Sequence, residues 1–206
     1  MRKDTVETYL RALAARIPAP GGGASAGLHA AQAAALLGMV ARYTDGEKYA
    51  DHAETVSAVR DAAEDLRERA LNLFEEDADA FGAVSQAYKL PRSTDEEKSA
   101  RSQAIATALV AAGEVPARLV AVAEQAVGLA EQLLPIANRN VISDVAAAAD
   151  AARAAATTAR VNVEINLAGI ADPEARAGLL AAIANVDELT TRADKVTTAV
   201  REVIAR

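Results

Sequence analysis

Residues 49–90, "YADHAETVSAVRDAAEDLRERALNLFEEDADAFGAVSQAYKL", contain no proline and a single glycine. Apolar side chains recur in this stretch at intervals of three and four residues. They are Val56, Val59, Ala63, Leu66, Ala70, Leu73, Ala80, Val84 and Ala87. Side chains at this spacing share one face of an α-helix. The stretch therefore predicts one long helix with an apolar seam, which would be the central element of a helical bundle.

Helix-breaking and capping residues divide the rest of the chain. Pro18 and Pro20 end a first helix, and a second runs from the glycines at 21–23 to about Tyr43. Residues 93–134 predict a fourth helix, with a Ser93–Glu96 capping box at its start and an expected kink at Pro116. A fifth helix is expected over 141–170, and a sixth opens with Asp172 as N-cap and Pro173 in its first turn.

The composition supports the same fold class. Hydrophobic residues make up 51% of the chain but aromatic residues only 3%, and tryptophan is absent. A core built from such small side chains requires elements that approach closely, which favours helices over sheets. We predict an all-α protein in which residues 1–206 form a single domain, an up-and-down bundle of about six helices.

Charge and residue usage exclude several functional classes. The net charge of −7 and the pI of about 5.0 argue against a basic nucleic-acid or membrane-binding face. The absence of cysteine excludes disulfides, thiolate metal sites and a cysteine nucleophile. His29 and His52 have no partners at ligand spacing, so no metal site is expected. The acidic residues near the N-terminus indicate an amphipathic helix rather than a signal peptide, and hence a cytoplasmic protein. Residues 24–43 are apolar but alanine-rich, which favours a buried core helix over a membrane span.

Asp77 interrupts the apolar seam of the long helix. A carboxylate in that position should face a neighbouring helix, where burial would raise its pKa and fit it for acid/base catalysis near neutrality. Two structural roles remain open for it. Asp77 could pair with an arginine of another helix, or the seam could rotate so that Asp77 reaches solvent.

Three polar residues share one face of the alanine-rich fifth helix. Asp144 and Asn162 are five helical turns apart, and Asn166 follows Asn162 by one turn. Asparagine is a poor choice for a helix interior, so two of them at this spacing need a reason. They could bind a ligand through their amides, or they could bond to neighbouring backbone in a tight interface.

The "PAPGGGAS" stretch, residues 18–25, places Gly21, Gly22 and Gly23 between Pro20 and the start of the second helix. Glycines allow positive φ and close backbone approach, so they could form a nest of N–H donors for an anion, or they could act as a hinge. No P-loop or dinucleotide fingerprint surrounds them. Asn138, in the turn before the fifth helix, places a further polar group near a helix start.

Several motifs together, in order and spacing, resemble the cyclodeaminase/cyclohydrolase family of folate enzymes. They are "PAPGGGAS" with Ser25 at its end, "EEDADAF" around Asp77, "YKLPR" with Lys89 and Arg92, "ANRNVISD" with Asn138 and Asp144, and "NVEIN" with Asn162 and Asn166. The likeness covers about residues 6–172. It departs from the family pattern at Ala24, where serine is common, and at Ala137, where glycine is common.

The resemblance implies an obligate helical homodimer that binds a tetrahydrofolate derivative near the dimer interface, with no cofactor beyond that substrate. It implies that Asp77 or Asp144 is the acid/base and that Asn162 and Asn166 hold the pterin or its one-carbon unit. The glycine nest, with Lys89 or Arg92, would receive the glutamate carboxylates.

Three functions follow as expectations. The first is conversion of 5-formiminotetrahydrofolate to 5,10-methenyltetrahydrofolate and ammonia, and the alternative is hydrolysis of 5,10-methenyltetrahydrofolate to 10-formyltetrahydrofolate. A related reaction on another substrate, or a helical binding module without chemistry, is the third.

Overall fold

The computed structural model describes residues 1–206 and contains helices and connections but no strand. Its elements, in chain order, are α1 (Val6–Leu13), α2 (Gly22–Tyr43), the 3-10 helix η1 (Glu47–His52), α3 (Ala53–Ala87), α4 (Asp95–Leu133), the 3-10 turn η2 (Arg139–Val141), α5 (Ile142–Leu167), α6 (Pro173–Ile183) and α7 (Val186–Ile204). The predicted all-α class is confirmed.

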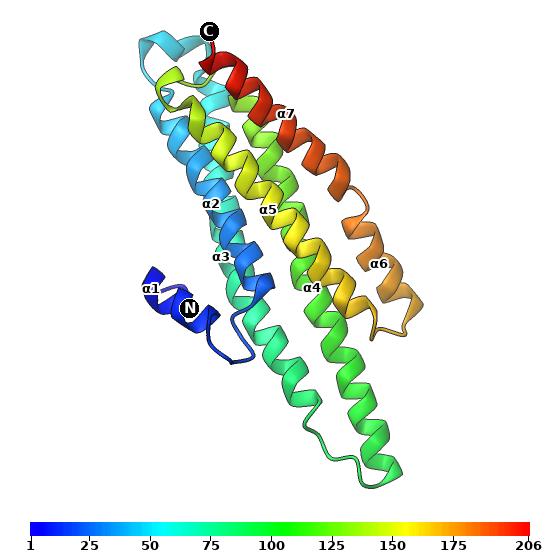
Figure 1. The fold of residues 1–206 in the computed structure, drawn as a ribbon. Coiled ribbons are helices and arrows are strands. Elements are labelled where there is room, and N and C mark those ends of the chain that lie inside the picture. The colour runs from blue at the N-terminus through cyan, green and yellow to red at the C-terminus, as the bar shows by residue number, and fades with distance from the viewer.

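Four long helices, α2 to α5, form the body of the bundle, and each runs antiparallel to the one before it (Figure 1). Each helix packs against its neighbours in the order α2, α3, α4, α5, and α5 closes the ring by packing on α2. The α7 helix lies along α5, while α6 packs mainly on α4. The short α1 helix lies beside the beginning of α2, where Tyr9 packs on Phe74 with ring centroids 5.3 Å apart.

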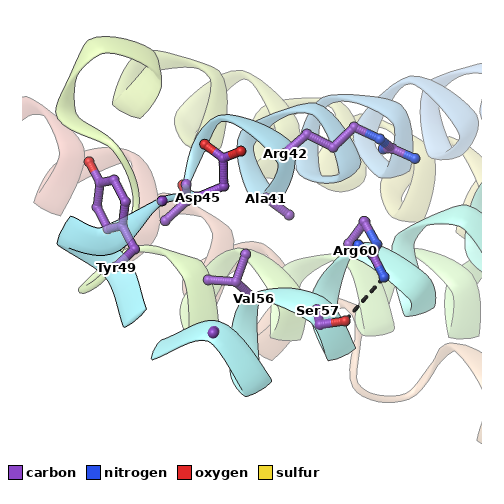
Figure 2. A pocket seen from close by; sticks show the side chains of 10 residues that line it. Ala41, Arg42, Asp45, Tyr49, Val56, Ser57 and Arg60 are labelled. Carbon is purple, nitrogen blue, oxygen red and sulfur yellow. Dashed lines mark hydrogen bonds between the residues drawn. The ribbon is translucent and has the colours of Figure 1, made fainter. Parts of the chain in front are cut away.

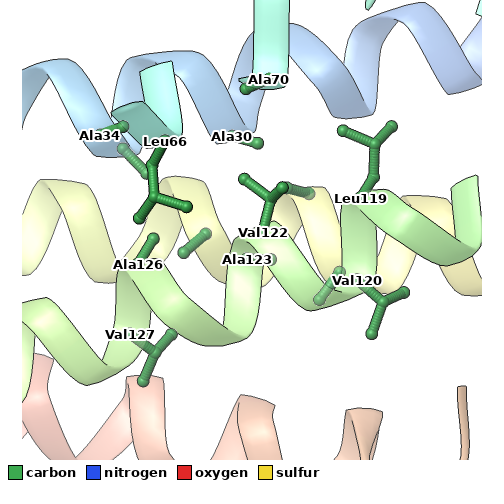
Figure 3. Packing of buried hydrophobic residues seen from close by; sticks show 14 of the residues in the cluster. Ala30, Ala34, Leu66, Ala70, Leu119, Val120, Val122, Ala123, Ala126 and Val127 are labelled. Atoms are coloured by element: carbon green, nitrogen blue, oxygen red, sulfur yellow. The ribbon is translucent and has the colours of Figure 1, made fainter. Parts of the chain in front are cut away.

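The core is built from alanine, valine and leucine, with alanine where helices approach most closely. Figure 3 shows Ala30, Ala123 and Ala126 between the ribbons of neighbouring helices, and all three are fully buried. At Gly27 the approach is closer still, because a Cβ atom there would lie 2.9 Å from the Cα atom of Phe74. Such contacts explain how a chain with few aromatic residues fills its interior.

The helix termini differ from the sequence-based expectation in three places. The capping box starts one residue later than predicted: the Thr94 side chain accepts from the Glu97 N–H, while Ser93 only donates its N–H to the Glu97 carboxylate. The expected sixth helix is two helices, broken at Ala184 and Asn185. The stretch that starts at 49 opens with part of η1, and the α-helix begins at Ala53.

Other termini are as predicted. Asp172 caps α6, and its side chain accepts from the Glu174 and Ala175 N–H groups. The α2 helix ends at Tyr43, and α4 continues through Pro116 as one helix. Both α2 and α4 are long and apolar enough to cross a membrane, a test that core helices of globular bundles also pass, and 61% of the apolar window in α2 is buried within this bundle.

Candidate active site

A cavity of about 160 Å³ opens where α2 begins, between α3, α4 and α5. Four segments that are far apart in the sequence supply its walls. The lining residues are Pro18, Ala19, Gly21, Gly22, Gly23, Asp77, Phe81, Ala112, Asn162, Ile165 and Asn166. The structure therefore brings the glycine triplet, Asp77 and both asparagines of α5 into one site.

The glycines serve close approach rather than an unusual backbone conformation. Gly21 is the N-cap of α2 with a φ of −140°, and neither Gly22 nor Gly23 has a positive φ. A Cβ atom on Gly23 would lie 1.9 Å from Oδ1 of Asp77, and one on Gly22 would lie 3.3 Å from Nδ2 of Asn162. A nest built on positive φ is therefore absent, and the side-chain space that Gly22 and Gly23 leave free is taken by polar groups of the site.

Asp77 is half-buried on α3 and faces the first turn of α2. Burial raises the pKa of Asp77 above its usual value of 3.8, and a hydrogen bond from the backbone N–H of Ala24 opposes that rise. None of the ion pairs of the structure includes Asp77, whereas the adjacent Glu76 pairs with Arg118. The interpretations as an interhelical salt bridge or a solvated residue are thus wrong, and Asp77 is a carboxyl group aimed into a cavity.

The amides of the two asparagines have fixed orientations. Nδ2 of Asn162 donates to the Thr158 carbonyl over 2.8 Å, and Nδ2 of Asn166 donates to the Asn162 carbonyl over the same distance. A carbonyl can only accept, so in each side chain the nitrogen faces the helix backbone. The two Oδ1 atoms receive no hydrogen bond from the protein. The bonds to backbone foreseen as an alternative to ligand binding thus exist, and they leave two free acceptors in a cavity wall.

A proline on α4 contributes to the orientation of Asn166. Pro116 has no N–H, so the carbonyl of Ala112, four residues earlier, lacks its intrahelical donor. Nδ2 of Asn166 donates to this carbonyl over 3.3 Å, and Ala112 lines the cavity. The interior proline thus frees an acceptor that ties α5 to α4 at the site.

Several predicted site residues lie elsewhere. The Ser25 hydroxyl donates to the Gly21 carbonyl and lies 3.3 Å from the Tyr9 hydroxyl, so it supports the α1–α2 connection. Pro20 is buried and does not line the cavity. Lys89 and Arg92 are exposed in the α3–α4 connection, twelve or more residues beyond Asp77.

Asp144 and Asn138 lie at the opposite end of the bundle. Eighteen residues of α5 separate Asp144 from Asn162, which at about 1.5 Å per residue is about 27 Å. Although Asp144 and Asn162 share one face of α5, they therefore do not belong to the same site within one chain. Asn138 joins two loops there, because its Nδ2 donates to the Tyr43 carbonyl over 2.7 Å and its Oδ1 accepts from the Asn140 N–H.

A second cavity, of about 360 Å³, lies at that far end between the end of α2 and the start of α3. Figure 2 shows Arg42 and Arg60 on its two sides and Tyr49 at one end. Both guanidinium groups are engaged, Arg42 by Glu64 and Arg60 by Asp61 and Ser57. Its residues show no convergence of free polar groups comparable to that around Asp77.

The site around Asp77 therefore combines a desolvated carboxyl group with two amide oxygens and no basic side chain. Such a set of acceptors favours a ligand group that is cationic or rich in N–H donors. The raised pKa of Asp77 suits proton transfer near neutral pH. No group of three or more His, Asp or Glu side chains arranged to hold a metal ion occurs in the structure.

Sequence reasoning missed Phe81, Ile165 and Pro116 as parts of the site. Phe81 follows Asp77 by one helical turn and Ile165 lies beside Asn166, so helical spacing from the polar residues was a usable signal for both. For Pro116, the pairing of its freed carbonyl with α5 depends on helix packing and has no signal in the sequence.

Comparison with known proteins places the chain. Residues 5–185 match the family model described as formiminotransferase-cyclodeaminase. The methenyltetrahydrofolate cyclohydrolase of Methylorubrum extorquens is 39% identical over 170 residues, which is 82% of each chain. The formimidoyltransferase-cyclodeaminase of Mus musculus is 34% identical over 80% of this chain, which corresponds to only 30% of the mouse protein. The crystal structure of formiminotetrahydrofolate cyclodeaminase from Thermotoga maritima superposes with a TM-score of 0.86 over 98% of both chains, at 28% identity. The chain therefore belongs to the formiminotransferase-cyclodeaminase family.

Proposed function

We propose that this protein is a 5,10-methenyltetrahydrofolate cyclohydrolase that forms 10-formyltetrahydrofolate. Sequence motifs alone favoured the cyclodeaminase, with the hydrolase as the alternative. We now rank the cyclohydrolase first, because the relative at 39% identity, which matches this chain over 82% of its own length, is named a cyclohydrolase. The mouse relative named for cyclodeamination carries a large additional part that this chain does not match.

The observation that carries the proposal is the set of three side-chain acceptors that Asp77, Asn162 and Asn166 place in one cavity. Methenyltetrahydrofolate carries a positive charge spread over N5, the one-carbon centre and N10. Two amide oxygens whose amides are already fixed, together with a carboxylate, would stabilise that cation without reorganisation when it binds. Basic side chains in the same place would repel it.

The reaction needs a water molecule and a group that moves protons. Water attacks the one-carbon centre and forms a carbon–oxygen bond, while Asp77 takes one proton from it. The bond from N5 to the carbon then breaks, its electron pair stays on N5, and Asp77 returns the proton there. The hydroxyl on the carbon loses its own proton to solvent and becomes the formyl carbonyl on N10. Asp77 thus acts first as general base and then as general acid.

The proposal is tested by absorbance, because methenyltetrahydrofolate absorbs distinctively and 10-formyltetrahydrofolate does not share that band. We expect the purified protein to accelerate loss of the band. The Asp77→Asn variant should lose a factor of about 10² to 10⁴ in kcat, the usual contribution of a general acid/base, while it keeps its helical content. Full activity of this variant would refute the role of Asp77.

Cyclodeamination is the second candidate, supported by the Thermotoga neighbour named a formiminotetrahydrofolate cyclodeaminase. The formimino group is also a nitrogen-rich cation when protonated, so the same three acceptors would suit it. The same absorbance assay distinguishes the two activities. A band that grows from 5-formiminotetrahydrofolate indicates the deaminase, and a band that decays from methenyltetrahydrofolate indicates the hydrolase. No change from either substrate contradicts both.

A further inference from the structure

The cavity around Asp77 is too small for a whole tetrahydrofolate. Its volume of about 160 Å³ is below the roughly 300 to 1,000 Å³ of pockets that enclose drug-sized ligands. Phe81, on the cavity wall, is 48% exposed, so the cavity is open along α3. The chain thus encloses the reacting end of the proposed substrate, and the rest of the substrate lies against the surface outside the cavity.

The halves of α3 and α4 that meet in their connection extend beyond the cavity. Gly23, in the first turn of α2, packs against Asp77, and Asn166, in the last turn of α5, bonds to Ala112. The start of α2 and the end of α5 are therefore level with the cavity. Figure 1 shows α3 and α4 continuing past both as a two-helix projection. We call this projection, residues 81–108, the α3–α4 arm.

One face of the arm is continuous with the cavity. Tyr88 follows Asp77 by eleven residues, which is three helical turns, and so lies on the same face of α3. Arg101 precedes Ala112 by eleven residues and in the same way shares its face of α4. Because α3 and α4 are antiparallel, both intervals run in the same direction, about 16 to 17 Å along the arm. Phe81 lies between the two levels, one turn beyond Asp77.

Arg101 is held at the far end of this face and has hydrogen-bond donors to spare. Its guanidinium lies over the Tyr88 ring, 5.6 Å from the ring centroid, and its Nη2 donates to the Tyr88 carbonyl over 3.1 Å. Its Nε is buried and has no hydrogen-bond partner, which is uncommon for a buried donor. Arg101 belongs to none of the ion pairs of the structure, whereas Lys98, one turn earlier, pairs with Asp95. A guanidinium that is fixed on an aromatic ring and lacks an anionic partner is suited to bind a carboxylate.

The remote part of a tetrahydrofolate has matching chemistry in the matching order. Beyond the one-carbon centre it consists of a benzoyl ring and then a glutamate. The extended path from the one-carbon centre to the glutamate carboxylates is roughly 10 to 13 Å long by ordinary bond lengths. With contacts of about 3 Å at both ends, the span becomes roughly 16 to 19 Å, which agrees with the distance along the arm from Asp77 to Tyr88. The benzoyl ring then lies beside Phe81, and two aromatic rings pack favourably.

We infer that the α3–α4 arm is the subsite for the remote part of the substrate, in which Phe81 packs on the benzoyl ring and Arg101, supported by Tyr88, binds a glutamate carboxylate. This assignment rests on the proposed function. The sequence motifs indicated Lys89 or Arg92 for the carboxylate, but both are exposed in the α3–α4 connection. Arg101 instead lies on the face that continues the cavity, in an orientation fixed by Tyr88.

A substrate without the glutamate isolates the contribution of Arg101. 5,10-Methenyltetrahydropteroate retains the reacting centre and the ring, but its carboxylate lies directly on the ring and is too near the cavity to reach Arg101. We expect the wild-type kcat/KM to be about 10- to 100-fold lower for the pteroate than for methenyltetrahydrofolate, the effect of one charged hydrogen bond. Arg101→Gln should lose the same factor with methenyltetrahydrofolate, mainly in KM because Arg101 is remote from the reacting carbon, and almost nothing with the pteroate.

The ratio of the two kcat/KM values does not depend on how much of a variant is folded, so a destabilised variant still gives a clear result. Lys98→Gln removes the same charge from the same arm, at a residue that is already paired, and is the matched control. It should keep the wild-type ratio, whereas Arg101→Lys should recover part of it. Phe81→Leu should lower kcat/KM about 2- to 10-fold for both substrates, since both carry the ring.

A loss of equal size on both substrates in Arg101→Gln would show that Arg101 only caps the end of α3, and this overturns the subsite. A loss in Lys98→Gln as large as that in Arg101→Gln assigns the effect to the overall charge of the arm and also overturns it. Equal wild-type kcat/KM for the two substrates overturns the subsite and leaves the proposed function intact. A wild-type protein that converts neither substrate refutes the proposed function, and the subsite falls with it.

Discussion

Replacing Gly23 by alanine should separate the catalytic geometry from the stability of the fold. The added Cβ atom would lie 1.9 Å from Oδ1, 2.5 Å from Cγ and 2.7 Å from Oδ2 of Asp77. Non-bonded atoms do not approach a Cβ closer than 3.0 Å, so the carboxyl oxygen must move by at least 1.1 Å, the difference between 3.0 and 1.9 Å. Misplacement of a catalytic group by about 1 Å costs on the order of 10²-fold in rate. We therefore expect kcat/KM to fall by about 100-fold, or about 2.7 kcal/mol of transition-state stabilisation.

The neighbouring glycines provide matched controls in the same assay. A Cβ on Gly21 would meet no atom within 4 Å, and one on Gly22 would meet the Asn162 amide at 3.3 Å, so Gly21→Ala should be nearly harmless and Gly22→Ala intermediate. Alanine is the better helix former by about 1 kcal/mol, so Gly23→Ala should not lower the melting temperature through the helix itself. Methenyltetrahydrofolate hydrolysis and thermal melting would be measured for all three. Wild-type activity in Gly23→Ala, or an equal loss in Gly21→Ala, would refute the steric argument.

Four further changes have expected outcomes. Asp77→Asn should raise the melting temperature at neutral pH, because burial raises the pKa of Asp77 above 3.8 and its charged form therefore destabilises the folded state. This cost appears as the pH rises through the folded-state pKa, so the gain in the variant should vanish towards pH 3.8. A gain that is independent of pH would contradict this explanation. Removing either acceptor, by Asn162→Ala or Asn166→Ala, should cost about 1.5 to 3 kcal/mol of binding to a cationic substrate, roughly 10- to 100-fold in kcat/KM, and unchanged steady-state kinetics would exclude contact with the substrate. Pro116→Ala restores the N–H that competes for the carbonyl bound by Asn166, so denaturation should show a more stable protein while the activity assay shows a several-fold loss; gains in both would exclude a positioning role. Gly27→Ala places a methyl group 2.9 Å from the α3 backbone and should destabilise the bundle by about 1 to 3 kcal/mol in urea unfolding, whereas unchanged stability would mean that the helices separate freely.

The fold was predictable from the sequence because its signals are local. Seam residues of α3 such as Val59 and Leu66 recur at helical spacing and are buried, and Asp172 caps α6 as its position before Pro173 indicated. Termini without a strong local signal were placed less well. Ser93 and Thr94 both precede acidic residues at capping distance, and only the completed helix decides which one is the cap. The split at Asn185 likewise has no proline or glycine to mark it.

The candidate site was predictable in part, and the division has a physical cause. Asp77, Asn162 and Asn166 violate the pattern of the helix that carries them, and natural sequences tolerate such violations mainly at functional sites. Periodicity fixes the face on which a residue lies but not its position along the bundle axis relative to other helices. For this reason periodicity placed Asp144 and Asn162 on the same face of α5. It did not show that they lie about 27 Å apart, at opposite ends of the bundle.

The proline inside α4 and the asparagine inside α5 explain each other. A proline inside a helix costs about 3 kcal/mol relative to alanine, and a helix-interior asparagine such as Asn166 is also unfavourable. Taken separately, each is a local defect of its own helix. In the folded chain the Ala112 carbonyl, which Pro116 leaves without a donor, accepts a hydrogen bond from the side-chain amide of Asn166. The proline thus provides an acceptor for Asn166, and Asn166 provides the donor that the carbonyl lacks. The remaining oxygen of that amide is then the one left for a ligand, opposite Asp77. The two defects therefore fix one orientation of one acceptor, which is why we expect removal of Pro116 to lower activity even though it stabilises the fold.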